Sequence, residues 1–185
     1  MPARAKLRSQ PGDVLVHVVR LRPGEGGDEG DPKCHRSQSS LVSEIRTGIV
    51  AAARWGIRNE PRIHYDAVRP MPLGRELPLT TDCSGFATLC YHLAGAPDPN
   101  ARGYDGYGWT GSLLEAMENV DRRAVLAGDI VVWGAYPGHH CAVVLEPGDD
   151  PLLASHGQER GPLAIRFSEE SRYQPPEVTW LSSLP

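Results

Sequence analysis

The chain has 185 residues, of which 40% are hydrophobic and 23% are charged, and its formal net charge at pH 7 is −4. This length fits one globular domain with a substantial core and a small extension, and it leaves no room for a second full domain. The acidic balance argues against a general nucleic-acid binder, which normally shows a basic excess or a basic face. No apolar run approaches transmembrane length, so no membrane partner is expected, and the run at residues 14–19 is too short for a secretion signal.

Residues 1–40 are interpreted as an N-terminal arm that precedes the main domain at residues 41–185. Within the arm, residues 13–21 are rich in valine and predict a strand, whereas residues 22–40 combine glycine, proline and charge without an apolar period. Ordering such a segment costs about 1 to 2 kcal/mol of backbone entropy per residue, so contacts must offset it. The arm is therefore predicted to attach to an assembly by adding its strand to a neighbouring sheet, and wrapping around its own domain is the alternative.

The main domain is predicted to open with a helix at residues 41–55. Apolar residues recur there at helical spacing, Ser39 or Ser40 is placed to cap the start, and Gly56 marks the end. Residues 59–79 then contain four prolines and are interpreted as a loop.

A second helix is predicted from Cys83 to about Gly95. Asp82 is a good N-cap, and the apolar residues that follow at helical spacing are Phe86, Leu89, Cys90, Leu93 and Ala94. A cysteine in the first turn lies at the positive end of the helix dipole, which lowers its pKa from about 8.5 toward neutrality and favours the nucleophilic thiolate. The alternative is that Cys83 is merely a small buried apolar residue, and residues downstream must decide between the two.

Residues 96–109 are interpreted as a loop in which aromatic residues, among them Tyr107 and Trp109, alternate with glycine. Such a loop is either a wall that contacts a ligand or a surface loop held by its rings, and both interpretations stay open. The Ser-Leu-Leu-Glu segment at residues 112–115 has the capping-box pattern and predicts a short helix to about Val120.

From residue 127 the apolar period changes to that of strands. Strands are predicted at residues 130–133, 140–145 and 152–156, with further short strands at 163–167 and 178–181. Turns separate these strands, which indicates an antiparallel meander. Helices followed by such a sheet predict an α+β fold in which the Cys83 helix packs against the sheet.

Two histidines of this sheet could serve Cys83. A thiolate catalyst needs an imidazole to hold it as an ion pair and to protonate the leaving amine, and a third polar group must orient that imidazole. His140 opens one predicted strand and His156 ends the next, so an antiparallel pairing would make them neighbours. Because side chains alternate between faces, only one of His139 and His140 can point at the helix end.

The cysteine spacing gives no sign of a metal site. The four cysteines are Cys34, Cys83, Cys90 and Cys141. None of them forms a CxxC pair, so neither a zinc ribbon nor a thioredoxin-type site is indicated, and we expect neither a metal nor a cofactor.

Several segments together carry a resemblance to a known family. They are Asp-Cys-Ser-Gly-Phe at 82–86, Ala-Gly-Asp-Ile-Val at 127–131, Gly-His-His-Cys-Ala-Val-Val at 138–144 and His-Gly at 156–157. In this order they resemble the signature of NlpC-type cysteine peptidases, papain-like enzymes that cut the peptide stems of bacterial peptidoglycan. The resemblance covers about residues 41–168. It implies that Cys83 is the nucleophile, His140 the general base and acid, and His156 the orienting residue, with the Cys83 backbone N–H in an oxyanion hole.

The same resemblance, together with the aromatic loop, suggests which side chains contact the substrate. The predicted substrate contacts are Tyr65, Asp82, Ser84, Tyr107, Trp109 and His139. Members of the family usually have a Tyr-x-Trp-Gly-Gly-like segment shortly before the cysteine. Here the nearest match, Ile-His-Tyr at residues 63–65, lies farther upstream and lacks the glycines.

The loop at residues 98–109 resembles that of phage-borne members from actinobacterial viruses, and the lack of a secretion signal agrees with a phage origin. The resemblance therefore implies a phage-encoded endopeptidase at the virion tail tip, which binds phage tail proteins through residues 1–40 and cuts the D-glutamyl to diaminopimelate bond or a neighbouring one. Two alternatives stay open. One is a tail-tip assembly module with the same fold, and the other is a free endolysin peptidase that moves from the host cytoplasm to the cell wall.

Overall fold

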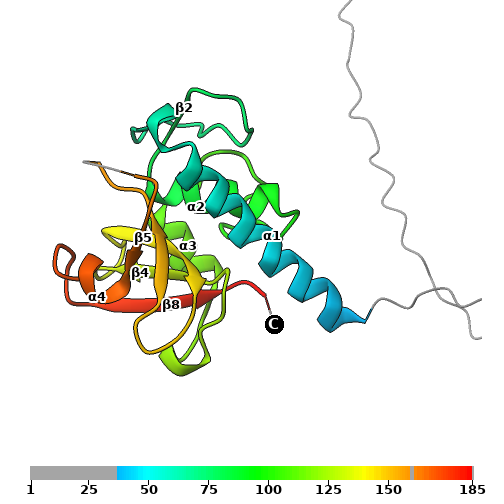
Figure 1. The fold of residues 1–185 in the computed structure, drawn as a ribbon, viewed down its shortest axis with the longest axis vertical. Helices are drawn as coiled ribbons and strands as arrows, with labels where there is room; N and C mark the ends of the chain where they lie inside the picture. Colours follow the sequence, from blue (N-terminus) through cyan, green and yellow to red (C-terminus); the bar gives the residue numbers. More distant parts are fainter. Residues whose placement is uncertain (1–36, 159–160, 185) are drawn as a thin grey trace, which may run out of the picture. The chain divides into compact units, whose positions relative to one another are not determined.

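The computed structural model describes residues 37–158 and 161–184 (Figure 1). The strand predicted at residues 13–21 lies outside the described residues. Most of the predicted arm at residues 1–40 does so too.

The first helix, α1, spans Gln38–Arg58 and starts earlier than its apolar stripe predicts. Ser37 is the N-cap, and its hydroxyl accepts a hydrogen bond from the Ser40 backbone N–H at 3.2 Å, so both serines predicted as caps lie inside the helix. Gly56 does not end the helix. A Cβ atom there would lie 2.4 Å from the Phe86 ring, which shows that this glycine permits close packing of two helices.

Residues 59–79, predicted as a loop, contain a short 3-10 helix and one strand, and a second strand begins at Leu79. The 3-10 helix η1 (Glu60–Arg62) leads into β1 (Ile63–Tyr65), which pairs in parallel with β2 (Leu79–Thr81). The prolines that suggested a loop lie outside both strands, where no ladder hydrogen bond is needed. The pairing brings Tyr65 opposite Thr81, two residues before Cys83.

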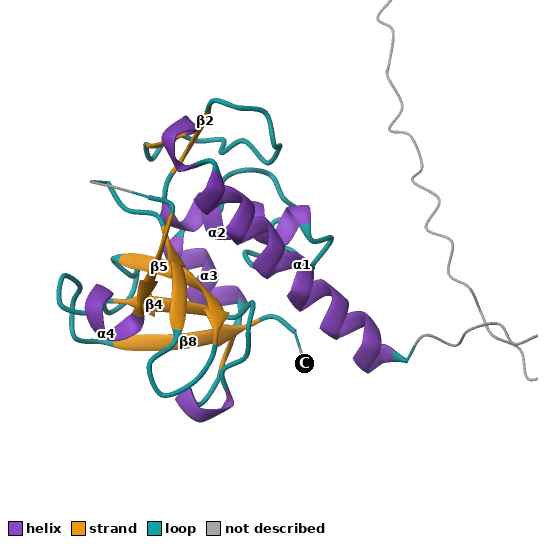
Figure 2. Ribbon diagram, viewed as in Figure 1, coloured by secondary structure: helices purple, strands orange, loops and turns teal. Residues whose placement is uncertain are grey.

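The predicted nucleophile helix forms as α2, Cys83–Leu93, and its predicted start is confirmed. The side chain of Asp82 caps it by accepting the Gly85 N–H at 2.7 Å. Residues 83–91 are buried, because α2 packs against α1 and also against the sheet. Figure 2 shows these helices grouped beside the strands.

The third helix, α3, spans Thr110–Ala116 and starts two residues before the predicted capping box. Ser112 is its third residue rather than its cap, and its hydroxyl accepts a hydrogen bond from the Trp109 N–H at 2.8 Å. The helix ends at Ala116, with Met117 as its C-cap. The short strand β3 (Glu118–Asn119) and the 3-10 helix η2 (Arg122–Ala124) follow.

The main sheet is antiparallel and has the order β3-β8-β4-β5-β6-β7. Its remaining strands are β4 (Ile130–Trp133), β5 (His140–Glu146), β6 (Leu152–Ser155), β7 (Leu163–Arg166) and β8 (Val178–Ser182). The predicted meander is confirmed from β4 to β7. The last strand does not continue it but returns beside β4, and the single-turn helix α4 (Phe167–Glu170) begins this return (Figure 1).

Both faces of this sheet are covered. We call the side against α1 and α2 the helix face; it carries Val143 of β5 in one core cluster with Ile49 and Phe86. The opposite side, the aromatic face, carries Trp133 and Trp180, with Phe167 packed against them. Burial on both faces explains why the sequences of β4 and β5 are continuous apolar runs. The helices packed on a mostly antiparallel sheet confirm the predicted α+β fold. In the described part of the chain, no helix is long and apolar enough to cross a membrane.

Candidate active site

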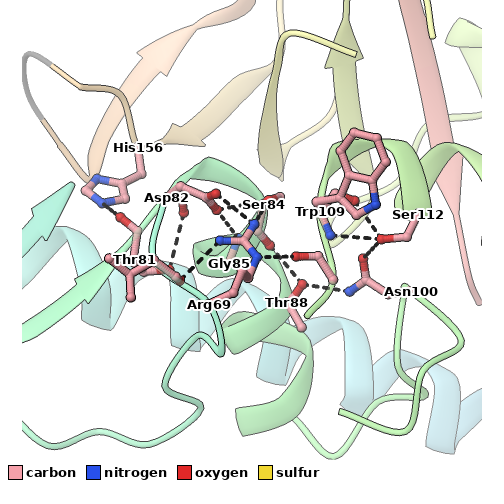
Figure 3. A network of polar contacts seen from close by, with 12 residues as sticks. Arg69, Thr81, Asp82, Ser84, Gly85, Thr88, Asn100, Trp109, Ser112 and His156 are labelled. Carbon is pink, nitrogen blue, oxygen red and sulfur yellow. Dashed lines mark hydrogen bonds and ion pairs between the residues drawn. The ribbon is translucent and has the colours of Figure 1, made fainter. Parts of the chain in front are cut away.

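The nucleophile candidate, Cys83, is the first residue of α2 and is 6% exposed. Both oxygens of the preceding Asp82 are occupied: Oδ1 accepts the Gly85 N–H at 2.7 Å and the Ser84 hydroxyl at 2.9 Å, and Oδ2 pairs with Arg69 at 2.8 Å (Figure 3). Asp82 and Ser84 are also buried. These two predicted substrate contacts therefore have another role in the structure, which is to build the turn that presents Cys83.

Arg69 ties this turn to two neighbouring segments. Its guanidinium donates to the Asp82 carboxylate, to the Ser84 hydroxyl at 3.2 Å and, through Nε, to the Gly108 carbonyl at 3.0 Å. The side chain is 20% exposed. Sequence reasoning missed this residue, because an arginine within a proline-rich stretch carries no local sign of its distant partners.

A second group of polar contacts fixes the loop at residues 96–109 to α2 (Figure 3). The buried Asn100 amide donates to the Thr88 hydroxyl at 2.9 Å, and its oxygen accepts the Ser112 hydroxyl at 2.7 Å. The Asp98 carboxylate accepts hydrogen bonds from the backbone N–H groups of Asn100 and Tyr104 at 3.0 and 2.8 Å. The loop is thus held by its polar side chains.

His140, rather than His139, meets Cys83. Its Nε2 lies 2.8 Å from the Ser155 hydroxyl and 3.2 Å from a Glu170 oxygen, so Nδ1 is the ring nitrogen left for Cys83. The ring stacks on Trp133 at 5.6 Å, which fixes its plane. Burial alone would lower the pKa of His140, but hydrogen bonds to Cys83 and Glu170 outweigh burial and raise that pKa to about 9.

The pKa of Cys83 is shifted in the opposite direction, to lower values. A hydrogen bond from the Cys141 thiol holds the pKa of Cys83 well below its usual range, and a hydrogen bond from His140 and its positive charge act in the same direction against burial. The combination of a lowered cysteine pKa and a raised histidine pKa favours a thiolate–imidazolium pair. In contrast, burial raises the pKa of the Cys90 thiol, which is a packing residue.

Tyr65 also reaches the sulfur of Cys83. Burial, followed by the negative charge of Cys83, raises the pKa of the Tyr65 phenol, and the phenol is hydrogen-bonded to Cys83. Tyr65 therefore stays protonated and offers an O–H donor at the nucleophile. Its position follows from the β1–β2 pairing, which sets Tyr65 opposite Thr81.

His156 does not take the predicted place behind His140. Its Nε2 lies 3.0 Å from the Thr81 carbonyl oxygen (Figure 3). Its ring packs on Tyr65 and Phe86 at 5.3 and 5.7 Å. Burial lowers the pKa of His156, which favours the neutral ring. This corrects the sequence interpretation: His156 supports the start of α2 and the Tyr65 ring.

The pleat of the sheet explains the correction. Ala142 of β5 pairs with Ser155 of β6, and His140 shares its face with Ala142, since side chains alternate. Ser155 thus points to the side of His140, and the next residue, His156, points to the helix face. Sequence reasoning chose the right strand but the wrong residue, and the alternation rule would have found Ser155 once the register was known.

The other predicted substrate contacts lie at the surface. His139 is exposed and lines a cavity of about 490 Å³ together with Ser155, Glu170 and Gln174. Tyr107 is 51% exposed, and the half-exposed Trp109 ring meets Tyr136 edge-on at 6.5 Å. A substrate role for these three residues stays a prediction.

Comparisons with known proteins add two solved structures. No family model and no curated protein matches the chain. The NlpC/p60 domain of the peptidoglycan hydrolase SagA is similar at 22% identity and a TM-score of 0.46, over 74% of this chain and 97% of that domain. An NlpC/p60 family protein from Bacillus cereus ATCC 10987 is similar at 15% identity and a TM-score of 0.48, over 76% of this chain and 40% of that protein. The chain thus spans less than half of the second protein, and both likenesses concern the fold alone.

Proposed function

We propose that the protein is a cysteine peptidase that hydrolyses the peptide stem of bacterial peptidoglycan. The observation that carries the proposal is the contact between Cys83, at the first position of α2, and His140, with their pKa values displaced in opposite directions. This arrangement supplies a thiolate nucleophile and a proton donor at one point.

In the first half of the reaction, the Cys83 thiolate attacks the carbonyl carbon of the scissile amide and forms a C–S bond. The resulting oxyanion is placed to accept hydrogen bonds from the Cys83 backbone N–H, which has no partner inside the helix, and from the Tyr65 phenol. His140 then gives its proton to the leaving nitrogen. The C–N bond breaks, and an amine and a thioester remain.

In the second half, neutral His140 takes a proton from water, and the hydroxide attacks the thioester carbonyl. The C–S bond breaks, which returns the Cys83 thiolate and the imidazolium and releases a carboxylic acid. Ser155 and Glu170 contact Nε2 in both halves and keep Nδ1 directed at the reacting atoms.

The substrate class rests on the sequence resemblance to NlpC-type peptidases at residues 82–86, 127–131 and 138–144. On the same ground, we propose the D-glutamyl to diaminopimelate bond, or a neighbouring stem bond, as the scissile one. The phage origin, the tail-tip location and the attachment through residues 1–40 stay predictions.

The test is incubation with purified peptidoglycan of the diaminopimelate type, followed by mass analysis of the released fragments. We expect soluble fragments with a new amine and a new carboxylate from the native protein, and none from Cys83→Ala. A folded native protein that releases nothing would instead favour the alternative of an assembly module with the same fold.

A further inference from the structure

A carboxylate approaches His140 from the side opposite Cys83. Glu170, the last residue of α4, places Oε1 at 3.2 Å from the His140 Nε2. The pair is largely removed from water, because the side chain of His140 is 7% exposed and that of Glu170 is 12% exposed. At this burial the attraction between opposite charges is far less screened than at the surface.

The Ser155 hydroxyl lies between the two residues and fixes the direction of the hydrogen bonds. It donates to Glu170 Oε1 at 3.1 Å, so its lone pairs face the His140 Nε2 at 2.8 Å. Nε2 must then carry the proton and donate it, which leaves Nδ1 for Cys83. A neutral hydroxyl can orient an imidazole in this way, whereas Glu170 also brings a negative charge to Nε2, which favours the imidazolium form.

The surroundings hold both members of the pair. Gln174 donates to Glu170 Oε1 at 3.0 Å, and Phe167, at the start of α4, stacks on Trp133 at 5.8 Å and 15°. The indole N–H of Trp133 also donates to the Ser171 hydroxyl at 3.1 Å. Trp133 stacks on the His140 ring as well, so one aromatic side chain positions both the imidazole and the helix that carries the carboxylate.

We propose that Glu170 is a positioning residue for the peptidase reaction: acting with Ser155, it fixes the tautomer of His140 and holds the positive charge that pairs with the Cys83 thiolate. The inference rests on the proposed function and assigns a third group that differs from the predicted His156. The charged groups that face His140 are Cys83 from α2 and Glu170 from α4, and the neutral ones are Ser155 and Trp133.

The test compares Glu170→Gln with Glu169→Gln, a matched loss of charge at an exposed neighbour in the same helix. The glutamine can still accept at the Oε1 position, so the change removes charge and keeps shape. We expect E170Q to lower kcat/KM on the order of 10- to 100-fold, a part of the 10²–10⁴ that a general base contributes. E170Q should also move the alkaline limb of the pH profile to lower pH, because a histidine without its anionic partner loses its proton earlier, whereas E169Q should match the native protein.

Iodoacetamide labelling of Cys83 separates this inference from the proposed function, because labelling needs no peptidoglycan. In E170Q the acid limb of the labelling profile should move to higher pH, since a weaker imidazolium stabilises the thiolate less. Such a shift supports the role of Glu170 even if the native protein releases no fragments, an outcome that would reject only the proposed function. Profiles of E170Q and E169Q that coincide with that of the native protein overturn the inference.

A second measurement removes the influence of the thiolate. In Cys83→Ala the thiolate is gone, and Glu170 still faces His140. An NMR titration of His140 should give a higher pKa in this variant than in the double variant Cys83→Ala/Glu170→Gln, because burial lowers the pKa of His140 and Glu170 opposes that effect. Equal pKa values in the two variants would reject the role of Glu170. Ser155→Ala should lower activity less than E170Q and leave the alkaline limb in place, because it removes orientation and keeps the charge.

Discussion

The two sides of the Cys83–His140 contact are built in different ways. On the cysteine side, Asp82 caps α2 through Ser84 and Gly85, which are its near neighbours in the chain. On the histidine side, the partners of His140 are Ser155 of β6 and Glu170 of α4, which only the sheet register and the return after β7 bring close. Local sequence therefore places the nucleophile at the start of α2, whereas long-range topology supplies the partners of its base.

The two sides also differ in what a nearby carboxylate does. Asp82 lies on the cysteine side, where its negative charge disfavours the thiolate, and Arg69 pairs with it at 2.8 Å. Glu170 lies on the histidine side, where its negative charge favours the imidazolium. The negative charge of the carboxylate is therefore neutralised by Arg69 on the cysteine side, whereas on the histidine side it stabilises the imidazolium.

The largest expected effect comes from removing the nucleophile. Cys83→Ala should lower the rate of stem-peptide hydrolysis about 10⁴-fold or more, because no other group can form the thioester. The thermal unfolding midpoint should change little, because alanine fits the first turn of a helix. Fragment release and a thermal melt measure the two quantities.

The matched control is Cys90→Ala, which changes a fully buried packing cysteine and should cost stability but no catalytic chemistry. Peptide mapping after iodoacetamide treatment gives an independent check. Labelling at Cys34 with none at Cys83 in the native protein would reject the assignment of the nucleophile.

The next effect tests the histidine side. His140→Ala should lower kcat/KM by about 10²- to 10⁴-fold, the range for loss of a general acid and base, and should also slow labelling of Cys83 near neutral pH. His139→Ala is the control for the labelling reaction, because His139 is exposed, lies outside β5, and should leave the labelling of Cys83 unchanged even where it weakens substrate binding. Equal losses of labelling in the two variants would contradict the placement of His140.

The position of Cys83 could be predicted because the residues that place it are close together in the chain. Asp82 as N-cap, Cys83 at the first position and the apolar stripe of α2 are all confirmed. Gly85, which the motif contains, also has a physical reason: a Cβ atom there would lie 2.4 Å from the Thr81 hydroxyl and 2.9 Å from Met71 Cγ.

The histidine side could be predicted only in part. The apolar period located β5 and β6, but the choice between Ser155 and His156 depends on the register with Ala142, which sequence alone does not supply. Glu170 sits in a single turn of helix that has no apolar period of its own. The β1–β2 pair was missed for a related reason, because parallel partners lie far apart in the chain and the prolines between them suggest a loop.

A smaller effect, on the free energy of unfolding, tests the ion pair between Asp82 and Arg69. Arg69→Met should lower the free energy of unfolding by about 2 to 3 kcal/mol, because it leaves the Asp82 carboxylate, 9% exposed, without its ion-pair partner. Arg54→Met is the control, since its pair with Glu146 is about half exposed and should contribute less than about 1 kcal/mol. Urea unfolding measures both, and equal losses would show that the Arg69 pair is no stronger than a surface pair.

The smallest expected effect concerns Cys141, the second residue of β5. It is 1% exposed and lies on the helix face, where its thiol donates to Cys83 and is the largest cause of the lowered Cys83 pKa. Cys141→Ala removes this donor, so the pKa of Cys83 should rise and the thiolate should be lost at a higher pH than in the native protein. Labelling of Cys83 by iodoacetamide should therefore slow about 3- to 10-fold on the acid side, which corresponds to a shift of up to about one pKa unit, and should be unchanged once the pH exceeds the new pKa. Cys90→Ala is the control, because it creates a similar cavity without touching Cys83. A pH profile that moves equally in both variants would assign the effect to packing. A profile that moves in Cys141→Ala alone would assign the effect to the thiol hydrogen bond.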